Sequence, residues 1–377
     1  MAGLYLHIPF CSKACHYCDF HFSTDTRYRE EMITCIIHEL ELQQELPSQP
    51  GPGTIYLGGG TPSLLFPAEL ERLFIALHRL FRIDPDTEIT LEANPEDLTM
   101  EKLKHLYQLG VNRLSIGVQS FHEETLRMMN RSHSAEQAKS AIQRSREAGF
   151  KNLSLDLIFA VPGRTTDLLK QDLDQLLSHD PEHISTYGLT IEERTVFGKR
   201  FSRGQFTPAS EDQNADEFEL IMDTLGGAGY RQYEVSNFAR TGFLSAHNSN
   251  YWQDVPYLGV GPGAHSYTGN ERFSNLANNH RYMTAIREDI LPRTVEVLGR
   301  EERINEYLMT SLRLDTGCDL TLLQQKFGHE PGQDQQRTIN GLLANGSAVL
   351  DRERLVLTRK GRLIADQIAA ELFVVRD

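Results

Sequence analysis

Three cysteines stand close together near the start of the chain, at Cys11, Cys15 and Cys18. The apolar run at residues 4–8 directly before them is typical of a buried strand that leads into a loop. A disulfide framework does not explain the three thiols, because the other two cysteines lie far away in sequence. Thiolates at this spacing can instead wrap around a soft metal centre.

Two metal centres fit this spacing. Three protein ligands can hold an iron–sulfur cluster and leave one iron open to a further ligand. Alternatively, His21 follows Cys18 closely enough to supply a fourth ligand and complete a structural zinc site. The residues alone leave both centres open.

Further residues that could bind a ligand follow later apolar runs. Residues 54–57 lead into Gly-Gly-Gly-Thr-Pro at 58–62, and glycines there let main-chain N–H donors approach a ligand closely, or simply make a tight turn. Polar side chains also stand where later strands are expected to end, at Glu92, Gln119, Ser120 and Asp156. Carboxylates can hold ribose hydroxyls or a sulfonium-linked amine through charge-assisted hydrogen bonds.

Alternating strands and helices are expected to position these groups. Strands are predicted near residues 5, 56, 90, 115, 155 and 186, with helical patterns between them, as in right-handed βαβ units. A full eight-unit barrel takes about 250 residues, so six units predict an α/β fold with a partial (β/α)6 TIM-like barrel. Its ligands should bind at the C-terminal ends of the strands.

The alternation weakens after the sixth strand. A charged, turn-rich stretch is predicted at 192–208, and short helices, a hairpin and a closing helix at 360–373 predict a winged-helix-like end of the chain. We therefore expect three parts: a barrel domain with the metal and ligand sites, a segment that closes the barrel, and a small C-terminal α+β domain. Their predicted bounds are 1–230, 231–300 and 301–377.

Composition limits the classes of function. The 377 residues include 38 basic and 52 acidic side chains, and the formal net charge of −14 argues against broad binding of nucleic acid. No apolar run approaches the ~20 residues that span a bilayer, so we expect a cytoplasmic protein with no membrane span. The reducing cytoplasm keeps thiolates available for a metal.

The motifs together resemble a known family. The stretch YLHIPFC with the following C-x3-C-x-Y-C resembles the cluster loop of the radical S-adenosylmethionine (SAM) superfamily. With GGGTP, LEANP, GVQSF, HNxxYW and GVGPGAHS, nearly the whole chain is similar to the HemW heme chaperone family, which is related to oxygen-independent coproporphyrinogen III oxidase.

This resemblance implies a cofactor set and its ligands. Cys11, Cys15 and Cys18 would hold a [4Fe-4S] cluster whose open iron is chelated by SAM, and Tyr17 would pack its ring over the cluster or the adenine. Arg131 would suit the SAM carboxylate or a second anionic ligand. The residues matching positions that bind SAM or the cluster are Tyr5, Tyr17, Gly59, Gly60, Thr61, Glu92, Gln119, Arg131 and Asp156.

Two functions stay open within this branch. The coproporphyrinogen III oxidase of the resemblance carries a longer N-terminal segment and a further cysteine where this chain has Phe20. Both differences, together with the HNxxYW motif, favour the chaperone. A chaperone would bind heme and transfer it to acceptor hemoproteins, whereas the alternative is radical decarboxylation of coproporphyrinogen III. A homodimer is one option for the assembly.

No CxxCH motif marks the heme ligand, and several histidines are eligible. His247 and His265 lie in the most family-like segments and are the candidates for heme ligation. Tyr251 and Trp252 are predicted to be packing anchors.

Overall fold

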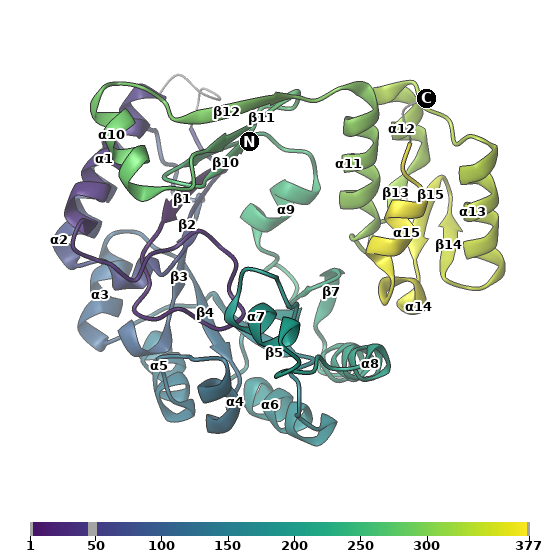
Figure 1. Cartoon of the computed structure of the whole chain (residues 1–377), viewed down its shortest axis with the longest axis horizontal. Helices are drawn as coiled ribbons and strands as arrows, with labels where there is room; N and C mark the ends of the chain where they lie inside the picture. The colour runs from purple at the N-terminus through teal and green to yellow at the C-terminus, as the bar shows by residue number, and fades with distance from the viewer. Residues whose placement is uncertain (1–2, 44–50, 375–377) are drawn as a thin grey trace.

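Six parallel strands form the centre of the structure, a computed structural model that describes residues 3–43 and 51–374 (Figure 1). All six were predicted from the sequence, and neighbours in the chain are neighbours in the sheet. The strands are β1 (Gly3–Ile8), β2 (Thr54–Gly59), β3 (Glu88–Ala93), β4 (Arg113–Gln119), β5 (Leu153–Phe159) and β6 (His183–Gly188).

Amphipathic helices cover the outer face of these strands (Figure 1). Local signals set where they begin: Pro67 opens one helix, and the hydroxyls of Thr99 and Ser134 accept hydrogen bonds from the first turns of two others. The helices are α1 (Arg29–Leu42), α2 (Pro67–Leu80), α3 (Met100–Gln108), α4 (Glu123–Met128), α5 (Ala135–Glu147) and α6 (Thr166–Ser178). The partial (β/α)6 barrel is confirmed.

Side chains alternate between the two faces of each strand. Leu4, Leu6 and Ile8 of β1 pack against the helices in the main hydrophobic core. Tyr5 and His7 point the other way, into the barrel, where Tyr5 stacks on Tyr56 of β2. The interior is therefore polar, and it can hold a polar ligand.

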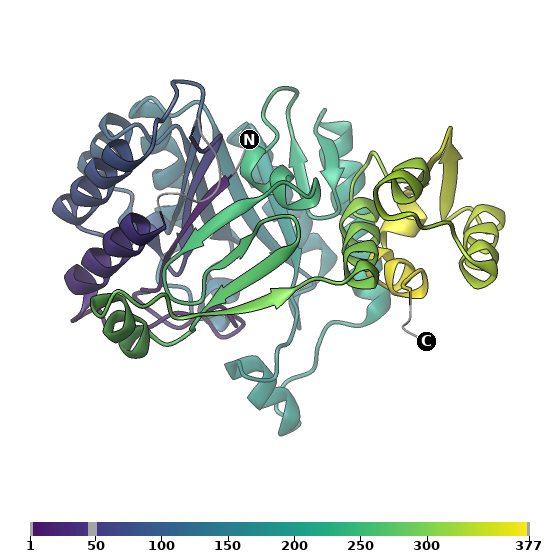
Figure 2. The ribbon, with the colours of Figure 1, turned by 90° about the horizontal axis from the view of Figure 1, so that it is seen from above.

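Both edges of the sheet are extended by residues 231–300. β7 (Arg231–Glu234) and β8 (Asn237–Ala239) join β6. At the other edge β9 (Tyr257–Val260) joins β1 and continues into β10 (His265–Tyr267), β11 (Glu271–Asn275) and β12 (Arg293–Val297). Seen from above in Figure 2, the green strands of this edge lead to the C-terminal domain. In the described part of the chain β12 and β7 do not pair, so the segment lengthens the sheet and leaves it open.

Four more helices accompany these strands. α8 (Glu211–Gly227) packs against α6, and α10 (Asn279–Arg287) packs against α1. α9 (Ala246–Trp252) carries the HNxxYW motif and contacts β2. α7 (Val196–Ser202) forms where only charged turns were predicted, capped by the Thr195 hydroxyl. The charged sequence around this short helix hid its apolar residues, Val196 and Phe197.

The C-terminal domain lies beside the barrel and has its own hydrophobic core (Figure 1). Its helices surround a three-stranded sheet in the order β13–β15–β14. The elements are α11 (Arg300–Leu312), β13 (Cys318–Asp319), α12 (Leu320–Phe327), α13 (Gln333–Ala344), β14 (Ala348–Asp351), β15 (Arg354–Leu357), α14 (Arg359–Arg362) and α15 (Ala365–Glu371). The predicted closing helix is thus two short helices. Among the described helices, none is long and apolar enough to cross a membrane.

Candidate functional site

The cysteine loop leaves the C-terminal end of β1 and packs on the glycine-rich turn after β2. The Gly60 N–H donates to the Ile8 carbonyl at 2.9 Å, and the Thr61 N–H donates to the Phe10 carbonyl at 2.7 Å. A Cβ atom on Gly60 would lie 2.7 Å from both carbonyl oxygens, which is closer than real Cβ contacts. Glycine is therefore required for the two segments to approach this closely.

Cys11, Cys15 and Cys18 are free and partly exposed on this loop. The Thr61 hydroxyl donates to the Cys11 sulfur at 3.4 Å, and the Arg131 guanidinium donates to the Cys15 sulfur at 3.4 Å. Burial, with a smaller contribution from the neighbouring thiols, raises the pKa of Cys11 to about 12 and that of Cys18 to about 11. Three thiols gathered in this way suit a cationic centre that stabilises thiolates.

The structure favours a multi-iron cluster over zinc. His21, the alternative fourth ligand, has its Nε2 2.7 Å from the Asn279 side-chain oxygen. Within residues 3–43 and 51–374, no three His, Cys, Asp or Glu side chains are arranged to hold one metal ion. An iron–sulfur cluster is wider than one ion, and each of its cysteines binds a different iron. The three thiols on this loop are therefore the candidate ligands of a [4Fe-4S] cluster, as the sequence predicted.

Arg131 clamps the cysteine loop to the strand ends. Its Nη2 donates to the Asn94 side-chain oxygen at 2.7 Å and to the Gly117 carbonyl at 2.9 Å. Its Nη1 lies 3.4 Å from both the Cys15 sulfur and the Tyr17 hydroxyl. The resemblance implied that Arg131 binds an anionic ligand, but in the structure these hydrogen bonds go to protein atoms. Of the three guanidinium nitrogens of Arg131, only Nε is buried without a hydrogen-bond partner among the described residues.

The glycine-rich turn offers a ligand main-chain carbonyl oxygens and not the expected N–H donors. The Gly59 N–H donates to Glu92 at 3.1 Å, and those of Gly60 and Thr61 bond to the β1 side, as described above. The expectation of free N–H donors is wrong for Gly59 and Gly60. Carbonyl oxygens are the main-chain groups left to accept a hydrogen bond from an amine.

Two carboxylates lie inside the barrel, close enough for the charge of one to act on the other. Glu92 accepts hydrogen bonds from the Tyr56 hydroxyl at 2.8 Å and from Gly59, and Asp156 accepts from the Ser115 hydroxyl at 3.3 Å. Burial raises the pKa of Glu92 to about 7, with the charge of Asp156 adding to the shift. Burial also raises the pKa of Asp156 to about 6. A cationic ligand would lower both pKa values and hold the carboxylates ionised.

Gln119 ends β4 under strain. Its φ of 64° lies in the left-handed region, which costs a residue other than glycine about 1–3 kcal/mol. Its side-chain oxygen is buried without a hydrogen-bond partner among the described residues, and the strand register shifts at this point. Strain and an unsatisfied amide together make Gln119 a candidate for ligand contact. Ser120, predicted at the same rim, instead donates to Asp172 on α6 at 2.8 Å.

The remaining predicted residues lie at different depths. Tyr17 packs on the small cluster of apolar side chains beside the loop, and its hydroxyl meets Arg131. Tyr5 lies deeper, with its hydroxyl 3.0 Å from Nδ1 of His7. The structure thus brings the cysteine loop, the glycine-rich turn, Glu92, Gln119, Arg131 and Asp156 to one end of the barrel, as predicted.

Sequence reasoning missed three supporting residues. Tyr56 holds Glu92, and α7 covers the cysteine loop through Phe197, whose N–H donates to the His16 carbonyl at 2.9 Å. Arg113 is 2% exposed, and its charge offsets part of the rise in the pKa of both barrel carboxylates. A charged residue opening a buried strand was the available signal for Arg113.

The two candidate heme histidines differ. His247 is buried at the opposite end of the barrel, with Nδ1 2.8 Å from the Thr54 hydroxyl and Nε2 2.9 Å from the Tyr251 hydroxyl. Both ring nitrogens are therefore engaged, and the ring stacks on Tyr56. His265 is exposed on β10. His247 therefore fills the N-terminal end of the barrel as a structural residue.

Comparisons with known proteins agree with this geometry. The radical SAM superfamily profile matches residues 5–176, and that of the HemN C-terminal domain matches residues 298–364. The solved coproporphyrinogen III oxidase (HemN) of Escherichia coli has a TM-score of 0.85 over 99% of this chain and 90% of its own. At 24% identity this likeness shows the fold. Fold and profile define the class, a radical SAM protein.

Curated relatives narrow the class. Two proteins named heme chaperone HemW are 35% identical, from Bacillus subtilis, and 37% identical, from Lactococcus lactis. They match over 98% and 99% of this chain, and over 98% and 97% of their own lengths. A mouse protein named radical S-adenosyl methionine domain-containing protein 1, mitochondrial, is 32% identical over 98% of this chain and 87% of its own. The chain belongs to the HemW family.

Proposed function

We propose that the chain is a heme chaperone that binds a [4Fe-4S] cluster, SAM and heme, and passes heme to acceptor hemoproteins. The similarity to curated heme chaperones over nearly the full length carries this proposal. The gathering of three free thiols at the mouth of a polar barrel supports the cofactor part. We expect this activity in the cytoplasm, with heme and its acceptors as partners and a homodimer as one possible assembly.

Cys11, Cys15 and Cys18 would hold the cluster, which supplies an open iron and reducing electrons when bound. The chain's own groups then position SAM. Glu92 and Asp156 offer negative charge to a cationic ligand, and the side-chain oxygen of Gln119 offers an unused acceptor. Arg131 keeps the loop seated on β3 and β4.

Phe20 favours the chaperone over the oxidase. It stands two residues past Cys18, where the resemblance gives the oxidase a further cysteine, and its side chain is 74% exposed. An exposed aromatic ring cannot replace a thiolate as a metal ligand. Decarboxylation of coproporphyrinogen III is therefore the second function to test.

One paired experiment separates the two functions. Anaerobically reconstituted protein receives heme in one sample, and coproporphyrinogen III with SAM and a reductant in the other. We expect a stable, stoichiometric Soret band in the first sample and no decarboxylated product in the second. Turnover to the divinyl porphyrinogen without retention of heme would overturn the chaperone proposal in favour of the oxidase.

A further inference from the structure

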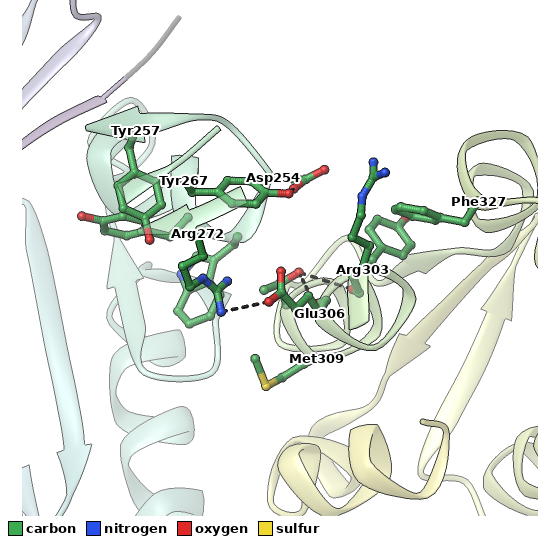
Figure 3. Close-up of a pocket in the computed structure, with 12 residues that line it drawn as sticks. Asp254, Tyr257, Tyr267, Arg272, Arg303, Glu306, Met309 and Phe327 are labelled. Carbon is green, nitrogen blue, oxygen red and sulfur yellow. Dashed lines mark hydrogen bonds and ion pairs between the residues drawn. The ribbon is translucent and has the colours of Figure 1, made fainter. Parts of the chain in front are cut away.

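A cavity lies between the barrel and the C-terminal domain, as Figure 3 shows. Its volume is about 270 Å³. One wall comes from α9 and β9–β11, and the other from α11 and α12. Tyr257 in the first wall pairs with Gly3, the first residue of β1, whereas the cysteine loop follows the last residue of that strand. The cavity and the cysteine loop are therefore at opposite ends of the barrel.

Aromatic rings dominate both walls. Tyr251 and Tyr257 meet edge to face with centroids 4.6 Å apart, and Tyr307 faces Phe327 at 5.9 Å across α11 and α12. The lining rings are Tyr251, Trp252, Tyr257, Tyr267, Tyr307 and Phe327. Rigid, flat side chains on two sides of a cavity suit a planar apolar ligand.

The charges of the cavity are balanced except at one residue. Arg272 pairs with Glu306 at 2.9 Å, and Asp254 pairs with Lys326. Arg303 forms no ion pair or side-chain hydrogen bond with the part of the chain that the structure describes, and its Nε is buried without a partner. Its guanidinium lies 5.4 Å from the centroid of the Phe327 ring. An uncommitted guanidinium at an aromatic wall suits a carboxylate of the same planar ligand.

We infer that this cavity is the heme site of the chain, with the porphyrin edge between the aromatic walls and a propionate on Arg303. The inference rests on the proposed chaperone function and adds the position of the cargo. Pockets for drug-sized ligands measure about 300–1,000 Å³, so this smaller cavity holds only part of the macrocycle. The exposed remainder sits at a domain boundary, where an acceptor can reach it.

This placement assigns a separate role to HNxxYW. Its histidine is engaged with Thr54 and Tyr251 and does not ligate the iron. Its two aromatic residues, Tyr251 and Trp252, belong to the cavity wall instead. Cluster and heme then occupy opposite ends of the barrel.

The test uses the full-length, cluster-loaded protein and two probes: heme, and heme whose propionates are methyl esters. Binding is read from the Soret band and from quenching of Trp252, the only tryptophan of the chain. We expect Arg303→Glu to weaken heme binding at least about tenfold, because a charge-assisted hydrogen bond becomes a repulsion. Arg303→Lys should retain most of the affinity. The esterified probe should bind wild type and Arg303→Glu equally.

Arg337→Glu is the matched control, because Arg337 lies on α13 of the same domain with its side chain 79% exposed. Tyr257→Ala gives a second test that does not depend on charge. It should weaken the binding of both heme and its methyl ester. If wild type binds heme but these Arg303 and Tyr257 variants bind it equally well, the position is wrong and the chaperone proposal stands. If wild type retains no heme, both are overturned.

Discussion

The two ends of the barrel are built from opposite chemistry. At the cysteine end, thiols, carboxylates and a strained amide converge from the ends of successive parallel strands. At the other end, aromatic rings and Arg303, which has no ion-pair partner within residues 3–43 and 51–374, converge from segments far apart in the chain. The first end is suited to a charged cofactor and a metal cluster, and the second to a flat, mostly apolar cargo.

A continuous series of contacts joins the two ends. The Tyr56 hydroxyl donates to Glu92 at the cysteine end, and the Tyr56 ring stacks on His247 with centroids 5.0 Å apart. His247 meets the Tyr251 hydroxyl, and Tyr251 packs on Tyr257 in the interdomain cavity. The helix with HNxxYW is therefore a shared wall: it lines the interdomain cavity and is linked to the cysteine end through Tyr56.

The largest effect is expected at the cysteine end. Cys15→Ala should remove the cluster completely, because two remaining thiols cannot hold it, and the brown absorbance and bound iron should both be lost. Cys318→Ala is the control, since Cys318 is buried in the C-terminal core, and it should keep the iron. A Cys15→Ala protein that still holds about four irons per chain would contradict the ligand assignment.

The shared wall gives the next largest effect. His247→Ala should lower the free energy of unfolding by about 2–4 kcal/mol, because it opens a cavity and leaves the Thr54 and Tyr251 hydroxyls without partners. Urea denaturation measures this loss. Heme bound by the variant should keep the wild-type absorption spectrum. A changed spectrum would instead identify His247 as an iron ligand and contradict its structural role.

His265→Ala is the control for this pair of histidines. Its exposed side chain should contribute within about 0.5 kcal/mol of stability, as for most surface positions. It also tests the other histidine proposed from the sequence. Loss of the Soret band in this variant would move the heme from the interdomain cavity to β10.

The sequence allowed the cysteine end to be predicted far better than the other end. Strand periodicity and the rule that ligands bind at strand ends placed Glu92 and Asp156 beside the loop. Local sequence carries no such rule for α7, whose Phe197 contacts the loop only after the chain folds. The interdomain cavity depends on Tyr257 and Phe327 meeting across a domain boundary, which no spacing in the sequence encodes.

The barrel carboxylates predict how SAM binding depends on pH. Their pKa values are raised to about 7 for Glu92 and about 6 for Asp156, so both ionise as the pH rises. SAM carries positive charge, and its affinity should therefore increase about tenfold from about pH 5.5 to about pH 8. Equilibrium dialysis of the cluster-loaded protein measures this change.

Two substitutions make the pH test specific. Glu92→Gln should flatten most of the pH dependence. Glu39 is the matched control, because burial also raises its pKa to about 7, but it bonds to Gly261 and Tyr282 between α1 and α10. Glu39→Gln should leave the SAM profile unchanged. Equal flattening by both variants would mean that the dependence arises outside the barrel.

The smallest effect separates strain from binding. Gln119→Gly should raise the free energy of unfolding by about 1 kcal/mol, because glycine adopts a φ of 64° without strain, and should weaken SAM binding by removing the amide. Arg352→Gly relieves a similar φ of 55° in the β14–β15 hairpin and should raise stability without changing SAM affinity. If Gln119→Gly gains stability and keeps full SAM affinity, the strained amide serves the strand bulge and makes no ligand contact.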